Sequence, residues 1–366
     1  MTAMTRSDSP IVGNTDLRLL NLRQSLQEAG LDVSELHPMA DTGLAHEHVW
    51  LCRQNGEDWV ARLPKQSQMK LTPRANLDYQ AACFARASQG GHTPALQAVL
   101  PPSNALPRGS LIVSAIKGRV ARLPQDLPAI AETLASLHRL PLPSFNARPP
   151  LLAPASPWQA MLEEILEQAR YLEAAQVSAA TCQQLGEELQ ILQTWLTQDH
   201  SEAVALISFD AHPGNFLIRD DGRAMLVDLE KCRYGLPGLD LAHATLYTST
   251  TWDVASYAEL GLDDVHGFYR HWASAMNHDD RYCDQEAVLQ CRRAMWLWSL
   301  TWCAKWRVEH QRARDATDAG EDWSNTLSDP ALIAHVRDRV DHYLSLPIVT
   351  RVCTELAFLE RLNLFG

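Results

Sequence analysis

One ordered series of polar residues, from Ser208 to Asp240, constrains this chain more than any other stretch. Within it, two short apolar, β-prone runs flank an Asp-Asp-Gly sequence at 220–222. An Asp-Gly pair between such runs is a strong turn signal. The pattern therefore predicts a β-hairpin with strands at 216–218 and 225–227.

Three side chains at the ends of this predicted hairpin have the chemistry of a metal and phosphate site. Asp210 and Asn215 precede the hairpin, and Asp228 follows it. Carboxylate and amide oxygens are hard ligands, and nucleotide-bound Mg²⁺ takes only one or two carboxylates from protein. One carboxylate is then left to accept a proton from a hydroxyl group that attacks phosphorus. The alternative is a solvated hairpin whose acidic residues only cap turns, which explains Asp220 and Asp221 but not the ordered series.

The series resembles the catalytic hairpin of the aminoglycoside phosphotransferase and choline kinase family, relatives of the protein kinases. In that family the loop reads His-Gly-Asp-x-His-x-x-Asn, and the strand that follows ends in Asp. Asp210, His212 and Asn215 match this motif, whereas Ser208 and Phe209 stand in place of His-Gly. The match continues in Val-Asp-Leu-Glu at 227–230, in Gly-Leu-Asp-Leu-Ala at 238–242 and in Leu-His-Arg-Leu-Pro at 137–141.

The resemblance implies an α+β, protein-kinase-like fold of two lobes. Residues 1–116 would form a small N-terminal lobe with an antiparallel β-sheet that binds the nucleotide. Residues 117–366 would form a larger, mainly helical lobe that holds the catalytic loop and the acceptor. We expect the first residues, up to about position 15, to be disordered.

In the first lobe the resemblance implies four positions that contact the nucleotide. Gly43 lies in the predicted turn of the nucleotide-covering loop, although the residues alone favour an ordinary hairpin turn. Arg62 lies on the predicted strand 59–64, where the family carries a phosphate-gripping lysine. Ser114 and Ile116 fall on a strand that resembles the hinge, where backbone groups receive the adenine. Backbone recognition leaves the choice between ATP and GTP open.

The first lobe also departs from the family. On the predicted helix 74–88 the family places a glutamate that pairs with the lysine, but the closest register here gives Gln80, with Asp78 nearby. An arginine is not equivalent to a lysine at such a site. These departures leave a second hypothesis open: a catalytically weak or inactive module that binds nucleotide or a metabolite. A protein kinase is disfavoured, because no Ala-Pro-Glu segment follows Asp228.

The function implied by the resemblance is transfer of the γ-phosphoryl group of ATP or GTP to a hydroxyl group of a small metabolite or antibiotic. Asp210 would act as the base, and Asn215 and Asp228 would hold Mg²⁺. His212 would brace the loop through hydrogen bonds, and Asp240 would stabilise it. The acceptor is not fixed by the sequence, because the residues that would line its pocket lie on variable helices.

Composition excludes several other classes of protein. The formal net charge of −12 argues against a nucleic-acid partner. The eight cysteines form no Cys-x-x-Cys pair, so neither a disulfide scaffold nor a metal framework is expected. No apolar run is long enough to cross a membrane. We therefore expect a cytoplasmic protein with no membrane partner. A small-molecule partner is what the resemblance implies, and the oligomeric state stays open.

Two segments of the second lobe complete the sequence predictions. The predicted helix at 292–312 contains four tryptophans, which either pack in the core or cradle a cationic ligand; we favour the core. The polar, acidic segment 313–328 is predicted to be a loop. The four tryptophans are Trp296, Trp298, Trp302 and Trp306.

Overall fold

The computed structural model describes residues 10–40, 43–67, 69–198, 200, 202–310 and 328–365. The chain forms two compact units. Unit 1 contains the described residues up to Ala81 together with Leu96–Ala115, and unit 2 contains Ala82–Ala95 and the described residues from Ile116 onward. Residues 1–9, predicted to be disordered, and nearly all of the predicted loop at 313–328 lie outside the described residues.

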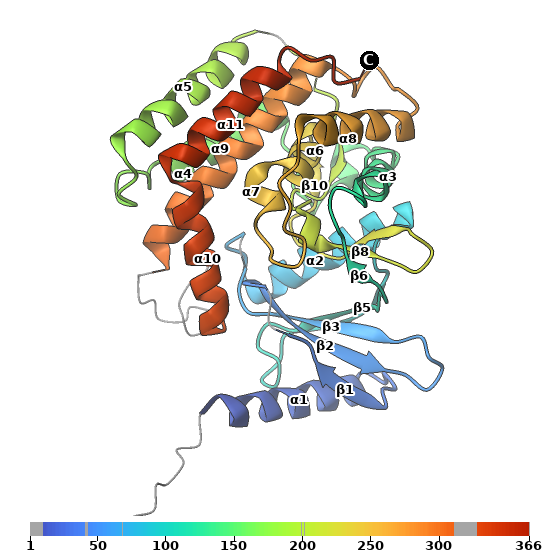
Figure 1. The fold of residues 1–366 in the computed structure, drawn as a ribbon. Helices are drawn as coiled ribbons and strands as arrows, with labels where there is room; N and C mark the ends of the chain where they lie inside the picture. The colour runs from blue at the N-terminus through green and yellow to red at the C-terminus, as the bar shows by residue number, and fades with distance from the viewer. Residues whose placement is uncertain are drawn as a thin grey trace, which may run out of the picture. The chain divides into compact units, whose positions relative to one another are not determined.

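Unit 1 is built on an antiparallel sheet in which the described residues contribute five strands in the order β1-β2-β3-β5-β4 (Figure 1). Helix α1 (Pro10–Glu28) contributes Leu22 and Leu26 to a core shared with Leu51 of the sheet. This helix begins at Pro10, and disorder of the first residues stays a prediction. The strands are β1 (Glu35–Pro38), β2 (His46–Cys52), β3 (Trp59–Pro64), β4 (Leu96–Leu100) and β5 (Ser110–Ser114).

Unit 2 is mainly helical and also contains two small antiparallel sheets in its described part. Helix α2 (Pro73–Ala87) begins in unit 1 and ends in unit 2, where the 3₁₀ turn η1 (Ser88–Gly90) follows it. The remaining helices are α3 (Leu127–His138), η2 (Phe145–Ala147), α4 (Pro157–Ala169), α5 (Ala179–Trp195), η3 (Pro213–Asn215), α6 (Pro237–Thr245), α7 (Tyr247–Thr250), α8 (Leu262–Ala275), α9 (Gln285–Glu309), α10 (Pro330–Tyr343) and α11 (Leu346–Leu359).

The predicted hairpin is present in unit 2. β8 (Phe216–Ile218) pairs with β9 (Ala224–Leu226), and Phe216 lies opposite Leu226. β9 ends one residue earlier than predicted, and β6 (Arg119–Val120) extends the sheet on the other side of β8. A separate pair, β7 (Ala205–Ile207) with β10 (Arg233–Gly235), flanks the hairpin in sequence. The predicted combination of a small antiparallel sheet and a larger helical part is confirmed.

Helix α9 forms much of the core of unit 2. It packs against α4 and α6, and the side chains of Trp296 and Trp306 are at most 1% exposed. The prediction of a core role is confirmed for these two tryptophans. Trp298 is half-buried, and its Nε1 donates a hydrogen bond to Glu164 on α4 at 3.0 Å. In the part of the chain that the structure describes, no helix is long and apolar enough to cross a membrane.

The contact between α6 and α9 gives a testable prediction. A Cβ atom added at Gly238 on α6 would lie 2.7 Å from Cβ of Cys291 on α9. Gly238→Ala is therefore expected to lower the free energy of unfolding by about 1–3 kcal/mol, because the helices must separate. Gly186 on α5 is the matched control, since an added Cβ there meets nothing within 4 Å.

Chemical denaturation of the two variants decides the question. Gly186→Ala is expected to raise the free energy of unfolding by about 0.5–1 kcal/mol, as for an exposed helical glycine. Equal stabilisation by both substitutions would contradict close packing of α6 on α9.

Candidate functional site

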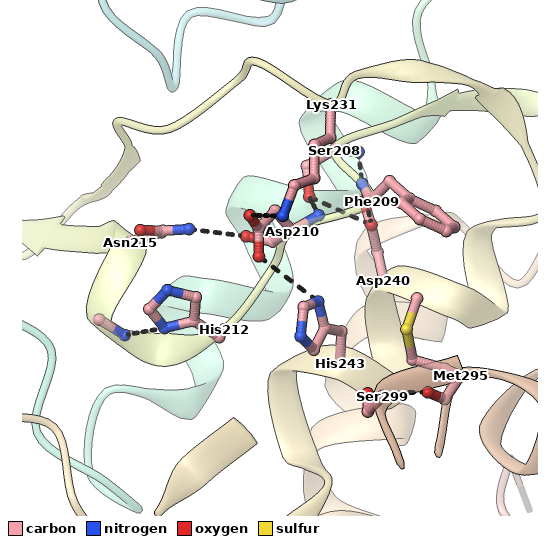
Figure 2. A network of polar contacts seen from close by, with 11 residues as sticks. Ser208, Phe209, Asp210, His212, Asn215, Lys231, Asp240, His243, Met295 and Ser299 are labelled. Carbon is pink, nitrogen blue, oxygen red and sulfur yellow. Dashed lines mark hydrogen bonds and ion pairs between the residues drawn. The ribbon is translucent and has the colours of Figure 1, made fainter. Parts of the chain in front are cut away.

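The loop that follows β7 is held by the carboxylate of Asp240 on α6. Asp240 is 0% exposed. Its Oδ2 accepts a hydrogen bond from the backbone N–H of Ser208 at 2.7 Å, and its Oδ1 accepts one from the N–H of Phe209 at 2.8 Å (Figure 2). The Ser208 hydroxyl donates a third hydrogen bond to this carboxylate, to Oδ1 at 3.1 Å. A buried carboxylate is tolerated only when its oxygens are hydrogen-bonded, so the loop and Asp240 stabilise each other.

A buried histidine completes the support of Asp240. The indole Nε1 of Trp272 donates to Nδ1 of His138 at 3.0 Å. Because an indole only donates, Nδ1 of His138 must accept, and the ring proton lies on Nε2. That Nε2 is 3.2 Å from Oδ2 of Asp240 and donates to it. His138 therefore links α3 and α8 to the loop anchor.

Phe209 has an unusual backbone conformation for a bulky residue. Its φ is +58°, in the left-handed region that favours glycine. The side chain is 1% exposed, and its ring meets the Trp298 ring edge to face at 5.2 Å. The guanidinium of Arg233 lies 3.7 Å from the ring centre. The strained residue is thus fixed by the hydrogen bonds that its own N–H and that of Ser208 donate to Asp240, and by the packing of its ring.

Asp210 lies next in the loop, and its side chain meets two groups that the sequence predictions did not include. Nζ of Lys231 is 2.8 Å from Oδ2, and Nδ1 of His243 is 3.9 Å from Oδ1 (Figure 2). Lys231 lies three residues after Asp228, and His243 lies three residues after Asp240 on the same helix. The helical spacing from Asp240 was the available signal for His243.

The charges around Asp210 determine its protonation. Burial alone raises the pKa of Asp210, but the positive charge of Lys231, with contributions from His212 and His243, lowers the pKa below its usual value. Burial lowers the pKa of Lys231, and the carboxylates of Asp210 and Glu230 outweigh this effect and raise it. Asp210 and Lys231 therefore form a charged pair at neutral pH.

His243 behaves differently from Lys231. Burial lowers its pKa to about 4, and the opposing attraction of Asp210 does not offset this effect. At neutral pH the His243 imidazole is therefore uncharged. Asp210 thus has one cationic and one neutral neighbour.

Asn215 and Asp228 lie beside Asp210 in the same loop and hairpin. The Asn215 side-chain amide donates to the backbone carbonyl of Asp210 at 2.9 Å. The backbone N–H of Val227 donates to the backbone carbonyl of Asn215, also at 2.9 Å. Asp228 follows Val227 directly, and its negative charge opposes the lowering of the Asp210 pKa. The second unit therefore brings together Asp210, Asn215 and Asp228.

His212 and Gly214 shape the turn between Asp210 and Asn215. Nδ1 of His212 accepts a hydrogen bond from the N–H of Gly214 at 3.2 Å, which agrees with the bracing role that the resemblance implied. A Cβ atom at Gly214 would lie 2.5 Å from Oδ2 of Asp253. A larger residue at this position would therefore require the side chains of Asp253 and His212 to shift.

The candidates of the first lobe lie in unit 1, except for Ile116, which begins the next segment of unit 2. The carbonyl of Gly43 accepts a hydrogen bond from Nζ of Lys65 at 2.9 Å. Arg62 lies on β3 and is 4% exposed, and its Nη1 is 3.2 Å from Nε2 of His48. Ser114 ends β5 opposite Trp59.

The structure identifies the partners of Asp78 and Gln80. Asp78 forms an ion pair with Arg74 at 2.9 Å, one turn earlier on α2. Oε1 of Gln80 is 3.0 Å from Nε2 of His46. Neither residue pairs with Arg62. The i, i+4 spacing on an exposed helix face explains why Asp78 pairs with Arg74.

A cavity of about 590 Å³ lies within unit 2, and the side chain of Phe209 forms part of its wall. Helix α4 contributes apolar and acidic residues to it, and Arg233 and Tyr234 complete the wall near the loop. Asp210 does not line this cavity. Phe209 thus both lines the cavity and packs against Trp298.

The conformation of Phe209 predicts an unusual order of stability. Removing a buried phenylalanine side chain costs about 3–5 kcal/mol, more than the 1–3 kcal/mol of backbone strain that is released. Phe209→Gly and Phe209→Ala are therefore both destabilised. Because φ is +58°, the glycine variant is expected to be the more stable of the two by about 1 kcal/mol.

Phe84 provides the matched control. It is 0% exposed and lies in the regular helix α2, where alanine is favoured over glycine by about 1 kcal/mol. Chemical denaturation should give the order Gly above Ala at 209 and Ala above Gly at 84. The same order at both sites would contradict a left-handed Phe209.

Comparison with known proteins connects this site to a family. A family model described as APH, the phosphotransferase enzyme family, matches residues 41–276, which is more than half of the 366 residues. A search of curated protein sequences found no significant match.

Solved structures share the fold at low sequence identity. A GDP complex of wild-type aminoglycoside 2'-phosphotransferase-IIIa is 15% identical, with a TM-score of 0.58, and covers 89% of this chain and 98% of its own. A putative aminoglycoside phosphotransferase from Ralstonia eutropha JMP134 is 11% identical, with a TM-score of 0.60 and coverage of 91% and 98%. Choline kinase LicA from Streptococcus pneumoniae is 15% identical, with a TM-score of 0.55 and coverage of 89% and 98%.

These likenesses show that the fold is the protein-kinase-like fold of such enzymes. The match to the family model covers both the hairpin with Asp210, Asn215 and Asp228 and the helix with Asp240. The chain is therefore a phosphotransferase that acts on hydroxyl groups, and it belongs to the APH phosphotransferase enzyme family.

Proposed function

We propose that this protein transfers the γ-phosphoryl group of ATP or GTP to a hydroxyl group of a small metabolite or antibiotic. The observation that carries the proposal is the loop and hairpin of unit 2, where the Asp210 carboxylate lies beside Lys231 and next to Asn215 and Asp228. Phosphoryl transfer needs alignment and neutralised charge more than covalent participation by the protein. A fixed anionic base beside hard oxygen ligands meets both needs.

Asp210 would orient the acceptor hydroxyl group and accept its proton. Oδ2 is held by Lys231 at 2.8 Å, which leaves Oδ1 available to the hydroxyl group. The surrounding positive charges, of which Lys231 contributes the most, together outweigh the effect of burial and lower the pKa of Asp210, so the carboxylate is ionised at neutral pH. A weak base suits a loose transition state, because the proton can leave late, after bond formation to phosphorus has begun.

The residues at the hairpin fit a magnesium ion. Asn215 uses its amide N–H on the carbonyl of Asp210, and its amide oxygen points away from Asp210 (Figure 2). Among the described residues, no group donates a hydrogen bond to this oxygen. An amide oxygen and the carboxylate of Asp228 are a donor set that Mg²⁺ favours with phosphate oxygens. When bound, the ion would neutralise charge on the phosphates.

The nucleotide would be held by unit 1 in this proposal. Arg62 would contact phosphate oxygens, Gly43 would lie in the covering loop, and the backbone at Ser114 and Ile116 would receive the base. Support comes from the family and from the solved relatives, one of which is a GDP complex and another an ADP-bound enzyme. The guanidinium of Arg62 can form a fork of donors to phosphate.

Phosphoryl transfer to a mixed panel of amino alcohols, aminoglycosides, macrolides, sugars and hydroxy acids tests the proposal. The purified protein is incubated with Mg²⁺ and either ATP or GTP, and products are detected by mass spectrometry as a gain of one HPO₃ unit. Asp210→Asn is expected to lower kcat by about 10²–10⁴-fold, as for loss of a general base. Asp228→Ala is expected to abolish metal-dependent turnover.

Asp221→Ala is the matched control in the same hairpin. Asp221 lies at the exposed turn, where it pairs with Arg223 at 3.0 Å. Its removal is expected to leave turnover within about twofold of the wild type. Full activity of Asp228→Ala would overturn the proposed site, and nucleotide binding without any product would favour a catalytically inactive binding module.

A further inference from the structure

His243 has a buried ring nitrogen that no group in the described part of the chain satisfies. Its Nδ1 is enclosed by protein and has no hydrogen-bond partner. The atom lies 3.9 Å from Oδ1 of Asp210, beyond the range of a hydrogen bond (Figure 2). A buried polar nitrogen without a partner costs free energy, so its retention at this position calls for a reason.

Neighbouring groups do not supply that partner. His212 is the nearest ring, with its centroid 6.3 Å away, and its own Nδ1 already accepts from Gly214. Lys231 is bound to the other oxygen of Asp210, Oδ2, at 2.8 Å. Within the described residues, the buried Nδ1 of His243 therefore faces Oδ1 of Asp210 without a hydrogen bond between them.

The chemistry of the two atoms is complementary. A neutral imidazole carries its proton on either nitrogen, and a nearby carboxylate favours the tautomer with the proton on Nδ1. The anionic Asp210 is such a carboxylate. Closing the gap from 3.9 Å to a hydrogen bond of about 2.9 Å requires a movement of only about 1 Å.

We propose that His243 is a positioning residue that holds Oδ1 of Asp210 through an Nδ1–H hydrogen bond when the acceptor is bound. Lys231 and His243 would then fix one carboxylate oxygen each and together set the plane of the base, and the second lone pair of Oδ1 would accept from the acceptor hydroxyl group. The catalytic consequence rests on the proposed function.

The choice of a neutral donor has a physical reason. A second cation at Oδ1 would stabilise the carboxylate further and weaken Asp210 as a proton acceptor. The His243 pKa of about 4, which results mainly from burial, keeps the imidazole uncharged at neutral pH. A neutral hydrogen bond thus orients the base at little cost to its basicity.

Steady-state kinetics of three variants tests the role. His243→Leu removes the donor and is expected to lower kcat about 10–100-fold, with KM for the nucleotide within about twofold of the wild type. His243→Asn places an amide N–H near the position of Nδ1 and is expected to lose only about threefold.

His266→Leu is the matched control. His266 on α8 also has a ring nitrogen, Nε2, that is buried and without a partner, so the substitution removes a comparable group elsewhere in unit 2. Its kcat is expected to stay within about twofold of the wild type. Equal activities of the leucine and asparagine variants at 243, in proteins with equal thermal midpoints, would overturn the positioning role.

A second measurement does not depend on activity. Long-range ¹H–¹⁵N spectra of protein labelled on histidine report the tautomer of each ring, and the signal lost in His243→Asn identifies residue 243. We expect Nδ1 of His243 to be protonated at neutral pH in the wild type, and the proton to move toward Nε2 in Asp210→Ala. An unprotonated Nδ1 in the wild type would overturn the inference even if an acceptor had been found. A protonated Nδ1 without any phosphorylated product would instead count against the proposed function alone.

Discussion

The candidate site depends first on the buried carboxylate of Asp240. Two backbone N–H groups, one hydroxyl group and one imidazole donate to its two oxygens. Loss of any donor would leave part of a buried charge uncompensated, so the network favours one conformation of the loop over its alternatives. The left-handed Phe209 is held within this network, and Asp210 follows directly after the two residues, Ser208 and Phe209, that are bound to Asp240.

The second constraint is electrostatic. Around Asp210 the structure places one cation, one neutral imidazole and a second carboxylate. The surrounding positive charge, to which Lys231 contributes the most, keeps Asp210 ionised despite burial, and the carboxylate of Asp228 limits that effect. A bound divalent cation at Asn215 and Asp228 would add a further positive charge to this group. The site is thus a set of opposing charges whose balance leaves Asp210 anionic and oriented.

Sequence reasoning was most successful where the physical signal is local. The hairpin followed from an Asp-Gly turn between apolar runs, and its strands differ from the prediction by one residue at β9. Sequence reasoning was weaker where interacting residues are distant in sequence. Asp78 and Gln80 were considered as partners for Arg62, but they pair with Arg74 and His46 instead.

By itself, the sequence determined the family, the hairpin and the identity of Asp210, Asn215 and Asp228 as candidates, because these are encoded by turn chemistry and by an ordered motif. Only the tertiary structure placed Lys231 and His243 on opposite oxygens of Asp210. The packing of α6 against the loop brings residues more than twenty positions apart into contact. Such contacts arise from the burial of whole elements, which a local motif does not specify.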